Sequence, residues 1–259
     1  MHPIEKYNQR AQKIDSLLCV GLDADPEKVS GSQFEFCKNI IDQTHEYAAA
    51  FKINSAFFEA KGIEGMEDLK KTVDYIKKNC PDIFTILDAK RADIGNTNNG
   101  YVSAIFDWLG FDAVTLHPYL GEEALAPFLE RKDKASIILC RTSNLGASEL
   151  QDLEVAGKPI WQIVAERVSE VWNKNNNCML VVGATYPEEM KKVRNIAGDI
   201  TFLVPGIGAQ GGDLEGVMKA GLNSEGLGLI INSSRGIIFA ADPRAEAQKL
   251  CEEIRKYRN

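Results

Sequence analysis

Aspartate and lysine residues alternate where one apolar segment of the chain ends. The run L-D-A-K-R-A-D-I-G-N-T contains Asp88, Lys90 and Asp93 and directly follows the apolar residues from Ile83. Asp88 and Lys90 are two residues apart, so on an extended chain their side chains would point to the same side. Nearby carboxylates keep a partly buried ammonium protonated, and such an ammonium can stabilise and then protonate a developing carbanion.

Two earlier apolar segments end in the same kinds of residue. The segment G-L-D-A-D provides Asp23, and F-K-I-N provides Lys52 and Asn54. An isolated charge after a strand usually lies on the solvated surface. Three successive apolar segments that end in charged or amide groups favour a shared pocket instead, with fixed charges directed at a substrate.

A glycine-rich segment and a late arginine predict a phosphate site. P-G-I-G-A-Q-G-G-D contains Pro205, Gly208 and Gln210, and N-S-S-R-G contains Arg235. Glycines let backbone N–H groups approach phosphate oxygens, and a guanidinium can bind them in a bidentate manner. A simple tight turn is one alternative. The segment also matches G-x-G-x-x-G, but that dinucleotide fingerprint normally opens the first β–α unit of a chain.

The elements that position these residues are short apolar runs separated by helical patterns. The runs are almost continuously apolar, as in parallel strands that are buried on both faces. They predict an α/β protein, a (β/α)8 TIM barrel formed by residues 1–259 as one domain, with an extra N-terminal helix in residues 1–16. A doubly wound sheet is the alternative, because local patterns do not establish closure. The eight runs are Leu17–Asp23, Ala48–Asn54, Ile83–Asp88, Ala113–His117, Ser136–Cys140, Cys178–Gly183, Ile200–Val204 and Gly226–Asn232.

The composition limits the partners of the chain. Its 259 residues are 44% hydrophobic, with a formal net charge of −7, which disfavours nucleic acid and anionic membrane surfaces as ligands. No apolar run approaches the roughly 20 residues that span a bilayer, and the polar N-terminus does not resemble a secretory signal. Six scattered cysteines without a C-x-x-C pair and three dispersed histidines predict a cytoplasmic protein with reduced thiols and no metal site.

Taken together, these motifs resemble those of the orotidine 5′-phosphate decarboxylase family. The resemblance extends from Asp23 to Arg235, and the variants R-T-S-N at 141–144 and T-L-H-P-Y at 115–119 are similar to the type 2 subfamily. It implies decarboxylation of orotidine 5′-monophosphate to uridine 5′-monophosphate, the last step of UMP synthesis, without a cofactor. It also implies a homodimer whose sites share residues across the interface.

The resemblance also implies a role for each matching residue. Lys90 would protonate C6 of the pyrimidine, and Asp88 would lie near the substrate carboxylate. Ser143 would recognise the pyrimidine, although Thr142 and Asn144 remain alternatives. The other catalytic residues would be Lys52 and Asp93. Asp93, Ile94 and Thr97 would reach across the dimer interface into the neighbouring site. Contacts to ribose or to the charged network would come from Asp23 and Asn54, and the phosphate site would consist of Pro205, Gly208, Gln210 and Arg235.

Two other functions fit parts of the sequence. A sister enzyme, a magnesium-dependent sugar-phosphate decarboxylase or aldolase, shares D-x-K-x-x-D but carries a glutamate at the end of its second strand. This chain has Lys52 there, and a cation beside a metal site would be repulsive. A non-catalytic phosphate-binding barrel would need only the glycine-rich segment and Arg235. For His117, which follows the fourth run, a structural role is the simpler interpretation.

Overall fold

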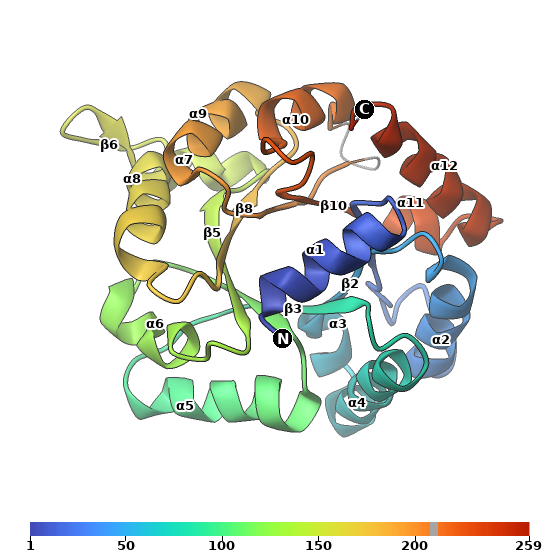
Figure 1. Ribbon diagram of the computed structural model, residues 1–259. Coiled ribbons are helices and arrows are strands. Elements are labelled where there is room, and N and C mark those ends of the chain that lie inside the picture. Colours follow the sequence, from blue (N-terminus) through green and yellow to red (C-terminus); the bar gives the residue numbers. More distant parts are fainter. Residues whose placement is uncertain (208–211, 259) are drawn as a thin grey trace.

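The computed structural model describes residues 1–207 and 212–258. Eight parallel strands form a closed barrel in the order β1-β10-β9-β8-β5-β4-β3-β2 (Figure 1). The predicted TIM barrel is therefore confirmed, and the doubly wound alternative is wrong because the first strand pairs with the last. The barrel strands are β1 Leu18–Gly21, β2 Ala50–Asn54, β3 Phe84–Arg91, β4 Ala113–Leu116, β5 Ala135–Arg141, β8 Cys178–Val182, β9 Phe202–Val204 and β10 Leu229–Ser233.

Helices surround the barrel and cover the outer face of its strands (Figure 1). Each of the longer helices packs one apolar stripe against the strands and exposes charged residues on the opposite side. The helices are α1 Pro3–Lys13, α2 Gln33–Thr44, α3 Ser55–Glu59, α4 Gly62–Asn79, α5 Asn96–Val102, α6 Gly121–Leu129, α7 Ser148–Gln151, α8 Ile160–Arg167, α9 Pro187–Ala197, α10 Leu214–Gly221, α11 Arg235–Ile238 and α12 Pro243–Arg255. A 3₁₀ turn, η2 Leu145–Ala147, precedes α7, and two π-helical segments, η1 Ser103–Leu109 and η3 Val168–Trp172, continue α5 and α8.

The predicted N-terminal helix is α1, and it lies across the end of the barrel where the strands begin (Figure 1). The buried hydroxyl of Tyr7 donates a hydrogen bond of 2.6 Å to the backbone oxygen of Leu229 at the start of β10. The Tyr7 ring also contacts Phe84, the first residue of β3, edge to face with 5.9 Å between ring centroids. The helix thus closes the amino-terminal end and leaves the carboxyl end for chemistry.

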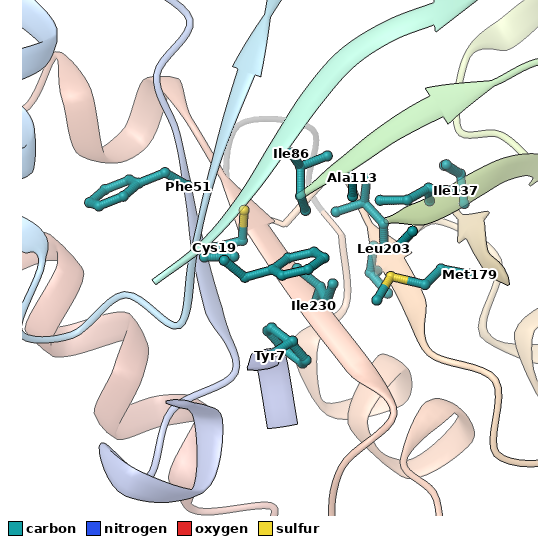
Figure 2. Close-up of a cluster of buried hydrophobic side chains, with 14 of the residues drawn as sticks. Tyr7, Cys19, Phe51, Ile86, Ala113, Ile137, Met179, Leu203 and Ile230 are labelled. Carbon is teal, nitrogen blue, oxygen red and sulfur yellow. The ribbon is translucent and has the colours of Figure 1, made fainter. Parts of the chain in front are cut away.

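Apolar side chains fill the interior between the strands and α1. Cys19, Ile86, Leu203 and Ile230 meet there, with Tyr7 beneath them (Figure 2). Burial on both faces explains why the strands read as continuous apolar runs. All six cysteines are buried and free of disulfides, as the scattered spacing predicts.

The segment between β5 and α8 contains a hairpin that the sequence did not predict. Strands β6 (Glu154–Val155) and β7 (Lys158–Pro159) pair antiparallel and project away from the barrel (Figure 1). Ala156 and Gly157 connect them, both with positive φ (53° and 78°), as a two-residue hairpin turn requires. With only two residues per strand and little burial, this hairpin carries no alternating pattern by which it could be recognised.

Across residues 1–207 and 212–258, no helix is both long enough and apolar enough to cross a membrane. The same residues contain no group of three or more histidine, cysteine, aspartate or glutamate side chains arranged to hold a metal ion.

Candidate active site

A pocket of about 490 Å³ opens at the carboxyl ends of the barrel strands. It brings together side chains from strands that are far apart in the sequence, because carboxyl ends of parallel strands meet at one end of a barrel. Lys90 and Arg235, the predicted proton donor and the predicted phosphate ligand, both line this pocket, as the sequence predicted. The other predicted residues that line it are Asp23, Lys52, Asn54, Asp88, Ser143 and Pro205.

Lys52 is the buried centre of a charged network. Its Nζ atom lies 3.4 Å from Oδ1 of Asp23 and 3.2 Å from Oδ2 of Asp88. Burial by itself would lower the pKa of Lys52, but the two carboxylates outweigh that effect and raise it above the ordinary lysine value. Lys52 therefore stays protonated and holds the two carboxylates in place.

Asp88 links the two lysines. Burial alone would raise its pKa, yet the charges of Lys52 and Lys90, with hydrogen bonds from Lys90 and Thr115, hold the pKa of the Asp88 carboxyl well below its usual range. Its Oδ1 atom lies 2.7 Å from Nζ of Lys90. Asp88 is thus a fixed negative charge inside the pocket.

Lys90 reaches the predicted pocket by an irregular backbone. Asp88 and Lys90 point into the same pocket, as their spacing predicted. The backbone between them is not a regular extended strand, because Lys90 has a left-handed φ of 47° and the pairing of β3 with β4 is shifted there. Its side chain is about half exposed, with a relative accessibility of 51%, although its neighbour Lys52 is buried. The ammonium is therefore presented to a ligand while Asp88 anchors it.

The loop after β5 forms another wall. Thr142, Ser143 and Asn144 all line the pocket, so the structure does not choose one of them as the pyrimidine contact. Gln151, at the end of α7, accepts a hydrogen bond of 2.9 Å from the Thr142 backbone N–H and donates one of 2.7 Å to its hydroxyl. A two-point contact of this kind fixes both the backbone and the side chain of Thr142.

Arg141, the last residue of β5, supports that wall from inside. It is buried, its guanidinium lies 3.3 Å from Oδ2 of Asp152, and it stacks 4.2 Å from the ring centroid of Tyr186. Gly183 follows β8 and has no side chain, so Ser143 can pack against it; a Cβ there would lie 2.8 Å from the Ser143 Cβ.

The opposite wall is the predicted phosphate end. Pro205, Ser234 and Arg235 line it, and Arg235 is exposed without an ion pair to any residue in the described part of the chain. A Cβ at Gly21 would overlap the Ser234 hydroxyl, so glycine at the end of β1 is what lets this turn approach closely. Gly208 and Gln210, also predicted for this site, lie outside the described residues.

Three predicted residues are not among those that line the pocket. Asp93, Ile94 and Thr97 follow β3, and Ile94 and Thr97 are exposed. The Asp93 carboxylate accepts a hydrogen bond from the neighbouring Ile94 N–H, and its backbone is held by Asn98. Their roles stay predictions, and those roles assume a second subunit.

The site also contains residues that sequence reasoning did not single out. Thr115 and Gln151 line the pocket, and each donates a hydrogen bond to a predicted residue: Thr115 to Asp88, and Gln151 to Thr142. Thr115 lies inside the T-L-H-P-Y motif, and its place at the end of an apolar run was a usable signal. No sequence pattern indicates Gln151, because its contact with Thr142 depends on the path of the irregular segment after β5.

The closed (β/α)8 barrel carries a lysine–aspartate network at its strand ends, opposite Arg235, which has no ion pair among the described residues. These features define the class of barrel enzymes. Comparison with known sequences gives the family. Residues 16–250 match the family described as "Orotidine 5'-phosphate decarboxylase / HUMPS family". The chain belongs to this family.

Similar proteins support the assignment over nearly the whole chain. The orotidine 5′-phosphate decarboxylase of Ralstonia nicotianae is 44% identical over 262 residues, which cover 96% of each protein. Among solved structures, the Leishmania donovani OMP decarboxylase superposes with a TM-score of 0.93 and 45% identity, covering 100% of this chain and 99% of that one. The Leishmania donovani UMP synthase gives a TM-score of 0.94 with 46% identity, and the match covers 57% of its chain.

Proposed function

We propose that this protein decarboxylates orotidine 5′-monophosphate to uridine 5′-monophosphate, with residues 1–259 acting as one catalytic domain. The observation that carries the proposal is the presence of Lys90, paired with Asp88, in the same pocket as Arg235. A nucleotide monophosphate has a pyrimidine at one end and a phosphate at the other. Membership of the family agrees with the same substrate.

In the proposed reaction, Lys90 acts on the carbon that loses carbon dioxide. The bond between C6 and the carboxylate breaks, its electron pair remains on C6, and carbon dioxide leaves. The Lys90 ammonium stabilises that carbanion and then donates a proton to it, becoming an amine that takes up a proton from solvent. Asp88 lies beside Lys90 and places negative charge near the departing carboxylate, while Lys52 keeps Asp88 in position.

The remaining residues hold the rest of the nucleotide. Arg235 binds the phosphate together with the glycine-rich segment after β9, which includes the proposed ligands Gly208 and Gln210. The loop after β5 contacts the pyrimidine through Ser143 or its neighbours, and Asp23 and Asn54 face the ribose. Binding energy from the phosphate orients the ring over Lys90, which is how a remote group contributes to the rate.

The position of Lys52 argues against a magnesium-dependent reaction. Its ammonium lies between Asp23 and Asp88, within 3.4 Å of an oxygen of each. A divalent cation bound by the same carboxylates would meet that positive charge, and repulsion would disfavour it. We therefore propose that no metal and no other cofactor takes part.

Ultraviolet absorbance tests the function directly. The purified protein is mixed with orotidine 5′-monophosphate, with and without EDTA, and the Lys90→Ala variant is the control. The expected result is conversion to the spectrum of uridine 5′-monophosphate at equal rates in both mixtures. A stable spectrum despite measured nucleotide binding would instead support a phosphate-binding barrel, and loss of turnover in EDTA would support the sister enzymes.

We also propose an active homodimer in the cytoplasm. Asp93, Ile94 and Thr97 lie outside this chain's own pocket, and large apolar side chains are exposed after β3 and after β4, with Ile94 61% and Tyr119 86% accessible. A second copy that covers these loops would bury that apolar surface and bring Asp93 to the neighbouring site. The six buried free thiols suit a reducing compartment.

A further inference from the structure

Strands β3 and β4 are mismatched in length at the catalytic end of the barrel. Leu87 pairs with Val114 and Arg91 pairs with Leu116, so residues 88–90 of β3 lie opposite Thr115 alone. A bulge of this kind leaves backbone groups of the longer strand without their usual partners in the sheet. The bulge contains both Asp88 and Lys90, the two residues that the proposed chemistry uses most directly.

The backbone of Lys90 is strained. Its φ of 47° lies in the left-handed region, which is unfavourable for a residue with a side chain. Such a conformation persists only where the surrounding structure fixes it. Here the Lys90 backbone N–H donates a hydrogen bond of 2.9 Å to Oγ1 of Thr115. The threonine hydroxyl thus replaces the backbone carbonyl that regular pairing would have supplied.

The same hydroxyl also fixes the carboxylate that Lys90 contacts. Oγ1 of Thr115 donates a hydrogen bond of 2.9 Å to Oδ1 of Asp88, and Nζ of Lys90 lies 2.7 Å from that oxygen. Thr115 has a relative accessibility of only 1%, so water has little access to take over these contacts. One hydroxyl therefore holds the Lys90 backbone and the Lys90 ion-pair partner at once.

We propose that Thr115 is a positioning residue that sets the place of the Lys90 ammonium, through the left-handed turn at Lys90 and through Asp88. This rests on the proposed role of Lys90 as the proton donor. Thr115 acts on the orientation of the donor and not on phosphate binding, because Arg235 and Ser234 belong to the opposite wall of the pocket. Its removal should therefore lower kcat with little effect on KM.

Thr85 offers a matched control on β3. It is also 1% accessible, its hydroxyl donates a hydrogen bond of 2.9 Å to Oδ2 of Asp112, and it accepts one of 3.1 Å from the Asp112 backbone N–H. It therefore makes the same two kinds of hydrogen bond as Thr115. It lies near the start of the strand and does not line the pocket among the described residues.

The experiment compares Thr115→Val, Thr115→Ala, Thr115→Ser and Thr85→Val for kcat, KM, thermal stability and the affinity for uridine 5′-monophosphate. Valine keeps the shape of threonine and removes the hydroxyl. We expect Thr115→Val and Thr115→Ala to lower kcat on the order of 100-fold, the effect of a small misplacement of a catalytic group. KM and nucleotide affinity should hardly change, Thr115→Ser should restore kcat, and Thr85→Val should lose stability but not kcat.

Three results would overturn the proposal. The first is a kcat of Thr115→Val and Thr115→Ala within about threefold of the unmodified protein. The second is a loss of kcat in Thr85→Val equal to that in Thr115→Val. The third is a Thr115→Ser variant with a kcat as low as that of Thr115→Val. If Thr115→Val does not fold, the comparison of kcat between Thr115→Ala and Thr115→Ser still tests the proposal. The proposed function fails separately, if the unmodified protein does not convert orotidine 5′-monophosphate, and the proposed role of Lys90 fails if Lys90→Ala turns over normally. Failure of the Thr115 proposal alone leaves the unmodified protein active and Lys90→Ala inactive.

Discussion

The Nζ atom of Lys90 lies 2.7 Å from Oδ1 of Asp88, and the second oxygen of that carboxylate lies 3.2 Å from Nζ of Lys52. One carboxylate therefore fixes two ammonium groups, one buried and one open to the pocket. The open ammonium is preorganised, since it needs no rearrangement before charge develops on a bound substrate. The buried pair provides the rigid support that keeps the carboxylate in place.

The first prediction concerns the proton donor. Lys90→Ala should lower turnover of orotidine 5′-monophosphate by at least about 10³-fold, because both electrostatic stabilisation and proton donation are lost. Uridine 5′-monophosphate should still bind, which calorimetry can measure. Lys219→Ala, at an exposed lysine on α10, is the control and should keep full turnover. Near-normal turnover by Lys90→Ala would falsify the assignment of the donor.

The sequence predicted most of what regular secondary structure determines. Strands buried on both faces produce continuous apolar runs, so all eight barrel strands and the helix α1 could be recognised. Because side chains at strand ends in a barrel meet at one pocket, Lys52, Asp88 and Arg235 were also placed correctly together.

The parts that escaped prediction depend on irregular backbone. The left-handed turn at Lys90 arises from the mismatch between β3 and β4, which has no local pattern. Gln151 reaches Thr142 from a segment of short turns that precedes the β6–β7 hairpin, and neither periodicity nor composition indicates that path. The proposed roles of residues 93–97 involve a second chain, and a single sequence does not give the position of such a chain.

The second prediction concerns the phosphate end of the pocket. Arg235→Ala should raise KM by about ten- to a hundredfold, since a charge-assisted hydrogen bond contributes about 1.5–3 kcal/mol. The measurement compares orotidine 5′-monophosphate with orotidine, which lacks the phosphate. The variant should lose affinity only for the phosphorylated substrate, and Arg244→Ala on α12 should behave like the unmodified protein. An unchanged KM, or an equal loss with both substrates, would contradict this phosphate site.

The third prediction tests whether Asp93 serves a neighbouring subunit. Lys90→Ala and Asp93→Ala variants should each be almost inactive alone. Mixed under conditions that exchange subunits, they should recover about one quarter of full activity, because half of the dimers are mixed and each mixed dimer has one intact site. Titrating one variant against the other and measuring turnover checks this. If mixing restores nothing although exchange is demonstrated, Asp93 acts within its own chain.

The last prediction follows from the lowered pKa of Asp88. A carboxyl whose pKa falls on folding stabilises the native state fully above its unfolded pKa of about 3.9, and that contribution disappears as the pH drops through the lower folded pKa. Asp88→Asn should therefore reduce the free energy of unfolding by about 2 kcal/mol at neutral pH.

Denaturant unfolding of both proteins from pH 7 to pH 3 measures this difference. The gap should stay constant down to about pH 5 and shrink below about pH 4, as Asp88 in the unfolded chain takes up its proton. Asp74→Asn, which removes an exposed carboxylate on α4, is the control and should give a small difference at every pH. A gap that widens in acid would mean that the two lysines do not stabilise the ionised form of Asp88.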